Sequence, residues 1–115
     1  MWIKRHLPGT RMSQAVVHNG IVYLAGQVAE DTAAGVRGQT EQVLWQVDTL
    51  LADCGSGKDR ILSATVYLAD IGTFAEMNAA WDAWVDRADP PARATVEARL
   101  AAPEYLVEIV VVAAR

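Results

Sequence analysis

The chain has very few cysteines and no concentration of positive charge. Cys54 is its only cysteine, so an internal disulfide is excluded. Acidic residues outnumber basic ones by 14 to 10, the formal net charge is −4, and no block of lysine or arginine occurs. Because nucleic-acid binding needs a concentrated basic surface, we expect no nucleic acid as a partner.

Long apolar runs and known cofactor motifs are also missing. The longest apolar run is about half of the roughly 20 residues that a membrane helix needs. Residues 1–6 lack the apolar segment of a secretory signal, so we expect a cytoplasmic protein without a membrane partner. His6 and His18 are isolated from other ligand-type residues, and no glycine-rich phosphate loop occurs. We therefore expect neither a metal nor a cofactor.

What is present indicates one globular domain over residues 1–115. Hydrophobic residues make up 52% of the chain, and we find no repeat or linker that would divide it. Two short apolar runs, 14–17 and 21–25, flank Asn19-Gly20, which is a strong hairpin signal because both residues tolerate positive φ. These runs predict the first two strands.

The period then changes to that of a helix. Apolar residues recur on one helical face between residues 43 and 54, and Gly55 is placed to end this helix. Residues 61–68 alternate and are rich in β-branched side chains, which predicts a strand. Thr73 and Glu76 match a capping box. The helix that they open carries an apolar stripe interpreted as core: Phe74, Met77, Trp81, Trp84 and Val85.

Two more strands are expected near residues 92–100 and 105–114, after Pro90-Pro91 stops the second helix. The predicted order is β-β-α-β-α-β-β, with an extra N-terminal strand at residues 2–4 as an option. Each helix has a single apolar stripe, so both should lie on one face of a mixed sheet. The predicted fold class is α+β.

The last strand is apolar on both of its faces. Val107, Ile109, Val111 and Ala113 share one parity, and Leu106, Val110 and Val112 share the other. Two helices cover only one face of the sheet, so a second subunit should cover the other. Glu108 has the parity of the second set. We therefore expect Glu108 near a subunit interface.

Arg93 and Glu108 form the candidate site. We expect the apolar parity of the preceding strand to face the helices, which leaves Arg93 and Thr95 on the side of Glu108. Antiparallel pairing of the last two strands would place Thr95 opposite Glu108 and Arg93 roughly 7–8 Å away on the diagonal. An arginine suits bidentate capture of a carboxylate, and a carboxylate in an apolar wall can exchange protons near neutral pH. A structural ion pair between these two residues is the alternative interpretation.

The chain resembles the Rid family of reactive intermediate deaminases (RidA/YjgF-like proteins) over nearly its whole length. The segments that carry the resemblance are Ser13-Gln14-Ala15, Gly26-Gln27, residues 74–78, and above all Pro91-Ala92-Arg93 followed fifteen residues later by Glu108. The resemblance implies a chorismate-mutase-like fold and a homotrimer with clefts between subunits. It also implies hydrolysis of 2-imino or enamine acids to 2-keto acids and ammonia, without a cofactor or metal.

In that scheme Arg93 binds the carboxylate of a small substrate and Glu108 holds and polarises the attacking water. Backbone groups near Gly26 and Thr95, with Asn78 nearby, shape the rest of the substrate site. The chain departs from the family pattern at three substrate-contacting positions: Met12, Ala25 and Thr95 replace tyrosine, serine and cysteine. These departures indicate a divergent subgroup. The lost hydroxyl groups at Met12 and Ala25 also motivate an alternative, a non-catalytic trimeric module that binds small keto acids or related metabolites. A nuclease activity is disfavoured by the acidic composition.

Overall fold

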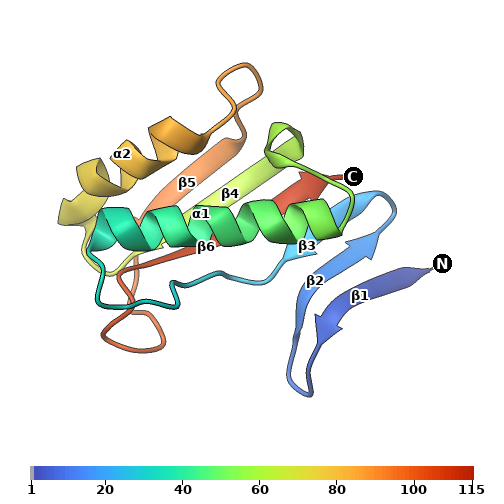
Figure 1. Cartoon of the computed structure of the whole chain (residues 1–115), viewed down its shortest axis with the longest axis horizontal. Helices are drawn as coiled ribbons and strands as arrows, with labels where there is room; N and C mark the ends of the chain where they lie inside the picture. The colour runs from blue at the N-terminus through green and yellow to red at the C-terminus, as the bar shows by residue number, and fades with distance from the viewer. Residues whose placement is uncertain (1) are drawn as a thin grey trace.

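The computed structural model describes residues 2–115 and contains two layers, a mixed six-stranded sheet and two helices packed on one of its faces (Figure 1). This is the α+β arrangement that the sequence predicts, including the optional N-terminal strand. The helices and strands, in chain order, are β1 Ile3–Pro8, β2 Ser13–His18, β3 Ile21–Leu24, α1 Val36–Asp53, η1 Lys58–Arg60, β4 Ile61–Leu68, η2 Ile71–Thr73, α2 Phe74–Trp84, β5 Ala92–Glu97 and β6 Val107–Ala114.

Turn chemistry fixes the first hairpin and the end of α1 as predicted. Asn19 and Gly20 have φ values of 51° and 76° between β2 and β3, which matches a two-residue hairpin turn. Gly55, which follows the C-cap residue Cys54 of α1, has a φ of 78°, and its missing side chain allows this left-handed conformation. No helix within residues 2–115 is long and apolar enough to cross a membrane.

The strand order is β1-β2-β3-β6-β4-β5, so β1 and β5 form the two edges of the sheet. β4 and β5 are parallel and are connected through α2, whereas the other neighbouring strands pair in the antiparallel sense. The predicted pairing of β5 with β6 is therefore wrong, because β4 lies between them. Residues 98–106 span this gap, and Ala98 N–H donates to Leu68 O of β4 at 2.9 Å.

The core lies between the sheet and the helices. Val107, Ile109, Val111 and Ala113 of β6 are fully buried there, and Val110 and Val112 are half-buried on the opposite, open face. The parity predicted for the last strand is confirmed within β6, but Leu106 lies before β6 and packs against the core. The helix-facing core is completed chiefly by residues of α1 and β4: Val43, Leu44, Val47, Leu50, Leu51, Ala64, Val66 and Leu68.

β5 faces the opposite way from the sequence prediction. Arg93 lies beside Ala64 of β4 and Thr95 beside Val66, and both of those neighbours are buried under the helices. Val96 of the other parity is 43% exposed on the open face. The prediction assumed that only apolar side chains face the helices. Arg93 faces them as well, because its long side chain carries the charged end to the edge of the space between sheet and helices.

The start of α2 also differs from its prediction. Thr73 makes no side-chain capping bond, and its hydroxyl donates instead to the carbonyl of Asp70, the residue before the short helix η2, at 2.6 Å. The capping box is therefore absent. Met77 and Trp81 of the predicted stripe are buried and Trp84 is half-buried, but Phe74 is 41% exposed and does not belong to the core.

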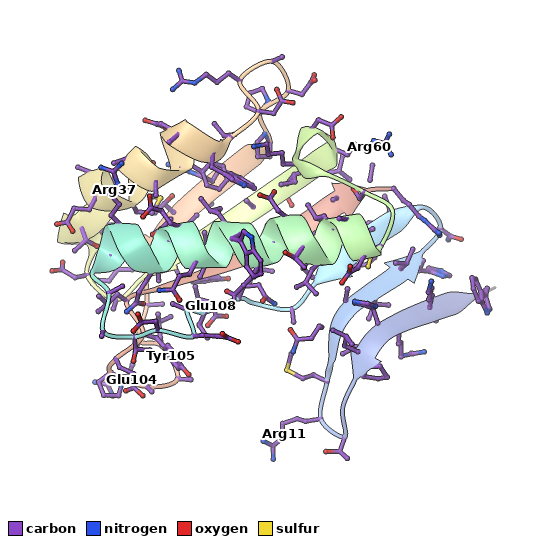
Figure 2. The ribbon with its side chains drawn as sticks, viewed as in Figure 1. Arg11, Arg37, Arg60, Glu104, Tyr105 and Glu108 are labelled. Carbon is purple, nitrogen blue, oxygen red and sulfur yellow. The ribbon has the colours of Figure 1, made fainter. Side chains whose placement is uncertain are left out.

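A buried amide of α1 positions the loop that leads into β6. Gln39 is fully buried; its Nε2 donates to Glu104 O at 3.1 Å, and its Oε1 accepts from Leu106 N–H at 3.0 Å. Glu104 and Tyr105 lie at the end of the molecule that carries this loop (Figure 2). Because both polar ends of the Gln39 side chain are satisfied, its burial stabilises one position of the loop.

Candidate functional site

Arg93 lies under α2 near the β5 edge of the sheet. Its Nη1 donates to Asn78 Oδ1 at 2.8 Å, and its Cζ lies 4.9 Å from the ring centroid of Trp81 and 5.8 Å from that of Phe74. Both ring distances are within the range of cation–π attraction. Burial lowers the pKa of the Arg93 guanidinium, and the negative charge of Asp82 opposes this effect. The guanidinium nevertheless remains a cation at neutral pH.

No carboxylate neutralises Arg93 within 4.0 Å among residues 2–115. Its partners are an amide oxygen, the Met77 sulfur and two aromatic faces, which orient the guanidinium but supply no full negative charge. A guanidinium has five donors in a planar fork, and the bond to Asn78 uses one of them. The remaining donors suit a carboxylate from a ligand.

Thr95 shares the helix-covered face with Arg93, two residues further along β5. Its Oγ1 is buried and has no hydrogen-bond partner within the part of the chain that the structure describes. A buried hydroxyl without a partner costs free energy of about 1–3 kcal/mol, so such groups in native proteins usually bind water or a ligand. Thr95 is not opposite Glu108, as the sequence prediction had it, because Tyr67 of β4 occupies that position.

Glu108 lies on the open face, on the other side of the sheet from Arg93. Its strand neighbours Val107 and Ile109 point into the core, and Glu108 itself is half-buried. The expectation that Glu108 and Arg93 of one chain share a face is therefore wrong. Glu108 lines a hollow of about 290 Å³ with Tyr67, Arg99, Val110 and neighbouring loop residues.

Gly26 provides the space that the Glu108 side chain occupies. A Cβ placed on Gly26 would overlap Glu108 Oε2 and would lie 3.0 Å from Glu108 Cδ. The next residue, Gln27, exchanges two backbone hydrogen bonds with Ile109, at 2.9 and 3.1 Å, which holds this loop along β6. The missing side chain at residue 26 is therefore what allows the carboxylate to lie against the loop.

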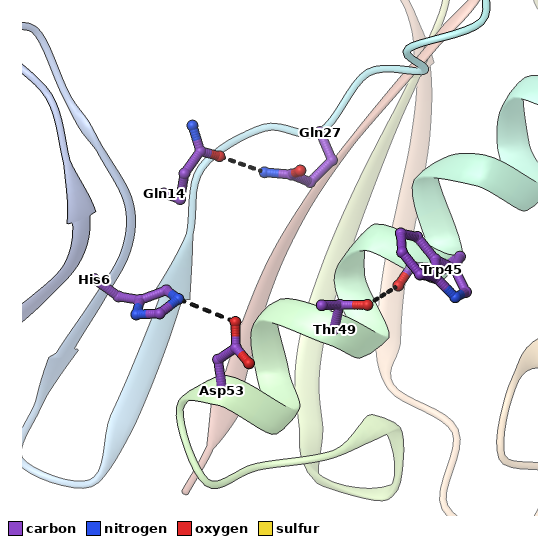
Figure 3. A network of polar contacts seen from close by, with 6 residues as sticks. All are labelled: His6, Gln14, Gln27, Trp45, Thr49 and Asp53. Carbon is purple, nitrogen blue, oxygen red and sulfur yellow. Dashed lines mark hydrogen bonds and ion pairs between the residues drawn. The ribbon is translucent and has the colours of Figure 1, made fainter.

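Ala25 is fixed from two sides. Its N–H donates to Gln14 O at 2.9 Å, and its carbonyl accepts from Gln27 Nε2 at 3.0 Å. The same amide nitrogen of Gln27 donates to Gln14 Oε1 at 3.2 Å (Figure 3). These bonds give Ala25 and Gly26 a defined backbone beside Glu108. They explain why Gln14 and Gln27 occur in the segments that carry the family resemblance.

Met12 lies in the turn between β1 and β2, and half of its surface is exposed. This hairpin projects from the sheet edge opposite β5, so Met12 is remote from Arg93 and Asn78 of the same chain (Figure 1). His6 Nε2 lies 3.2 Å from Asp53 Oδ2 and connects the hairpin to the end of α1 (Figure 3).

The predicted site residues thus form three groups within one chain. The first group lies between α2 and β5 and contains Asn78 of the helix and Arg93 and Thr95 of the strand. The second lies at the open face and contains Ala25, Gly26 and Glu108. Met12, in the hairpin turn, is the third. Sequence reasoning missed the contacts of Phe74 and Trp81 with Arg93. The spacing of Phe74, Asn78 and Trp81 at i, i+4 and i+7 could have indicated one helical face around the arginine.

Arg99 was also missed as a candidate. It follows β5 by two residues, is exposed, and lines the same hollow as Glu108. The strand predicted from the sequence extends to residue 100, which put Arg99 on the same face as Arg93. The sequence therefore did not show that Arg99 lies beside Glu108 instead. Within residues 2–115, no group of three or more histidine, cysteine, aspartate or glutamate side chains could hold a metal ion.

Comparison with known proteins gives a consistent family assignment. Residues 3–115 match the family model described as Endoribonuclease L-PSP. A RutC family protein of Haemophilus influenzae is 50% identical over 114 residues, which cover 98% of each chain. The RutC family protein YoaB of Escherichia coli is 48% identical over 104 residues and 90% of each chain.

Solved structures agree with these sequence relatives. A YjgF family member from Neisseria meningitidis superposes with a TM-score of 0.95 at 48% identity, covering 100% of this chain and 96% of that one. The Rid family protein YyfA from Yersinia pestis, described as of unknown function, gives a TM-score of 0.85 at 32% identity, covering 94% and 90%. The chain therefore belongs to the YjgF/RidA family.

Proposed function

We propose that the chain hydrolyses small 2-imino or enamine acids to 2-keto acids and ammonia, in clefts between the subunits of a homotrimer. The observation that carries the proposal is the Arg93 guanidinium, which is oriented by Asn78 and two aromatic rings and has no carboxylate partner. Family membership supports the same class of chemistry.

A second copy of the chain is needed to bring Arg93 and Glu108 into one cleft. The two residues lie on opposite faces of the sheet within one chain. Arg93 is on an edge strand, and the open face that carries Glu108 also exposes Tyr23 and Val96. An uncovered apolar face beside an unpaired edge favours association with a neighbouring subunit. If the edge of one copy meets the open face of the next, the contact is head-to-tail, and a rotation of about 120° between copies closes it into a trimeric ring.

The proposed reaction needs only a bound substrate and one water molecule. Arg93 of one subunit binds the substrate carboxylate in a bidentate manner, which fixes the adjacent C=N carbon. Glu108 of the neighbour accepts a proton from a water molecule as its oxygen attacks that carbon. Glu108 passes this proton to the nitrogen, which gives a carbinolamine. The carbinolamine hydroxyl then loses its proton to Glu108 and the nitrogen gains one, so that the C=O bond forms as the C–N bond breaks. The imino acid and water thus yield a keto acid and ammonia, and Glu108 returns to its starting state.

The test couples the purified protein to an amino acid oxidase that generates the imine. We expect Arg93→Ala to lower kcat/KM by roughly 100-fold or more, because it removes two charge-assisted hydrogen bonds. Arg60→Ala, a change at an exposed arginine of η1, is the matched control and should leave kcat/KM unchanged. Full activity of Arg93→Ala would contradict the proposed role.

Mixing two inactive variants tests whether the cleft is shared. Arg93→Ala and Glu108→Gln are each expected to be inactive as pure oligomers. In randomly mixed oligomers, about a quarter of the head-to-tail interfaces would combine an intact Arg93 with an intact Glu108. Activity should therefore return to about a quarter of the wild-type value on mixing. No recovery in oligomers proven to be mixed would contradict the shared cleft.

A second candidate function is capture of keto acids without turnover. The replacements at Met12 and Ala25 favour it because they remove two hydroxyl groups that the family pattern has at these positions. Calorimetry with 2-ketobutyrate separates the two candidates. Binding that Arg93→Ala abolishes, together with no hydrolysis across a panel of imines, would establish the binding module and reject the enzyme.

A further inference from the structure

The hollow that contains Glu108 has an arginine of its own. Its lining includes Glu108 and Tyr67 on neighbouring strands and the loop residues 98–101, and the cation among them is Arg99. Arg93 does not line it. A single chain therefore already presents a guanidinium and a carboxylate to one space of about 290 Å³.

Arg99 is held at its backbone and free at its side chain. The bond from Ala98 N–H to Leu68 O, at 2.9 Å, extends the β4–β5 pairing to the residue before it. Its guanidinium is exposed, and within residues 2–115 it forms no ion pair within 4.0 Å, even with Glu108. The loop 98–101 also borders a larger hollow of about 710 Å³, so the Arg99 side chain stands between two open spaces.

We infer that Arg99 binds a second carboxylate of the substrate, so that the preferred substrates are short 2-imino dicarboxylic acids. This inference rests on the proposed function. In the shared cleft, Arg93 of one copy takes the carboxylate beside the reacting carbon, and Glu108 takes the water. Arg99 is then an unused cation at the same hollow, and a side-chain carboxylate of the substrate is the group that neutralises it.

Charge balance favours the same substrate class. A monocarboxylate neutralises Arg93 and leaves Arg99 facing an apolar end of the substrate. A dicarboxylate places one anion on each guanidinium and keeps Glu108 free for the water. A hollow of about 290 Å³ has room for a four- or five-carbon diacid. For 2-iminosuccinate, the water oxygen replaces the nitrogen at C2, and the products are oxaloacetate and ammonia.

The experiment compares two imines in the wild type and in Arg99→Gln. An aspartate oxidase generates 2-iminosuccinate, and a general L-amino acid oxidase generates the imine of leucine. We expect the wild type to have the higher kcat/KM for 2-iminosuccinate. Arg99→Gln should lower that value about 10- to 100-fold, as expected for a lost hydrogen bond between two charged groups, and leave the value for the leucine imine nearly unchanged.

Two further variants separate recognition from structure. Arg99→Lys keeps the charge and should recover part of the preference, and Arg60→Gln should change neither substrate. Equal losses for both imines in Arg99→Gln, or an unchanged preference, would overturn the inference. If the wild type hydrolyses neither imine, the proposed function fails by itself. The inference then depends on calorimetry: oxaloacetate should bind more tightly than pyruvate, and Arg99→Gln should remove the difference. Equal affinities would overturn it.

Discussion

The two faces of the sheet present their charged residues in different surroundings. On the helix-covered face, Arg93 is oriented by Asn78, Trp81 and Phe74 before any ligand arrives. On the open face, Glu108 lies against Gly26 and has no ion pair within 4.0 Å among residues 2–115. The comparison indicates that one chain preorganises the carboxylate-binding half of the proposed site, whereas the water-activating half depends on what covers the open face.

The same contrast distinguishes the two arginines. Arg93 is partly buried, and its orientation is set by an amide oxygen and aromatic rings. Arg99 is exposed on a loop and has freedom to adjust. A preorganised side chain loses little conformational entropy when it binds a ligand. A mobile side chain loses more, so its contact adds less to the binding free energy. This difference fits a primary contact at Arg93 and a substrate-selecting contact at Arg99.

The largest expected effect tests the two faces directly at adjacent residues of β6. Ile109→Ala removes a fully buried side chain and should lower the free energy of unfolding by about 2–5 kcal/mol without changing the oligomeric mass. Val110→Ala, the matched change on the open face, should act mainly by weakening association. Denaturant unfolding and light scattering measure both. Equal destabilisation by the two variants, with no change in mass, would remove the distinction between the faces.

A smaller effect is expected when the space that Gly26 leaves for the Glu108 side chain is filled. Gly26→Ala places a Cβ against the carboxylate and should displace it, so we expect kcat to fall about 10- to 100-fold with little loss of keto-acid binding. Gly35→Ala is the control, because a Cβ there meets nothing within 4 Å. Parallel losses of kcat and keto-acid binding would show that Gly26 shapes the whole cleft, and wild-type kcat would show that the Glu108 position is not critical.

The sequence predicted most of the elements and the placement of Glu108. Alternation in residues 61–68, the Asn19-Gly20 turn and the helical spacing before Gly55 each reflect a local rule, and the structure confirms them. Glu108 was placed near a subunit interface because it shares the parity of Val110 and Val112, and the structure places this parity on the open face. Strong local patterns therefore sufficed for these features.

Local sequence patterns did not predict which strand pairs with β5 or which of its side chains face the helices. Strands that follow one another in the chain are often neighbours, but β4 lies between β5 and β6 because its parallel pairing with β5 is set by long-range packing of α2. Alanines in β5 carry little apolar preference, so a parity containing Arg93 and Thr95 looked like the polar one. Only the aromatic and amide partners from α2 show why an arginine belongs under a helix.

The smallest expected effect concerns the orientation of Arg93. Phe74 lies 5.8 Å from the guanidinium and is 41% exposed, so Phe74→Leu should remove a weak cation–π contact without disturbing the core. We expect KM for the imine to rise about two- to fivefold, equivalent to roughly 0.5–1 kcal/mol, with kcat and Tm unchanged. Trp45→Leu, at a 68% exposed aromatic of α1, is the matched control and should leave KM unaltered. Because an exposed ring contributes to binding only through its contact with Arg93, an unchanged KM in Phe74→Leu would mean that Asn78 and Trp81 alone orient the guanidinium.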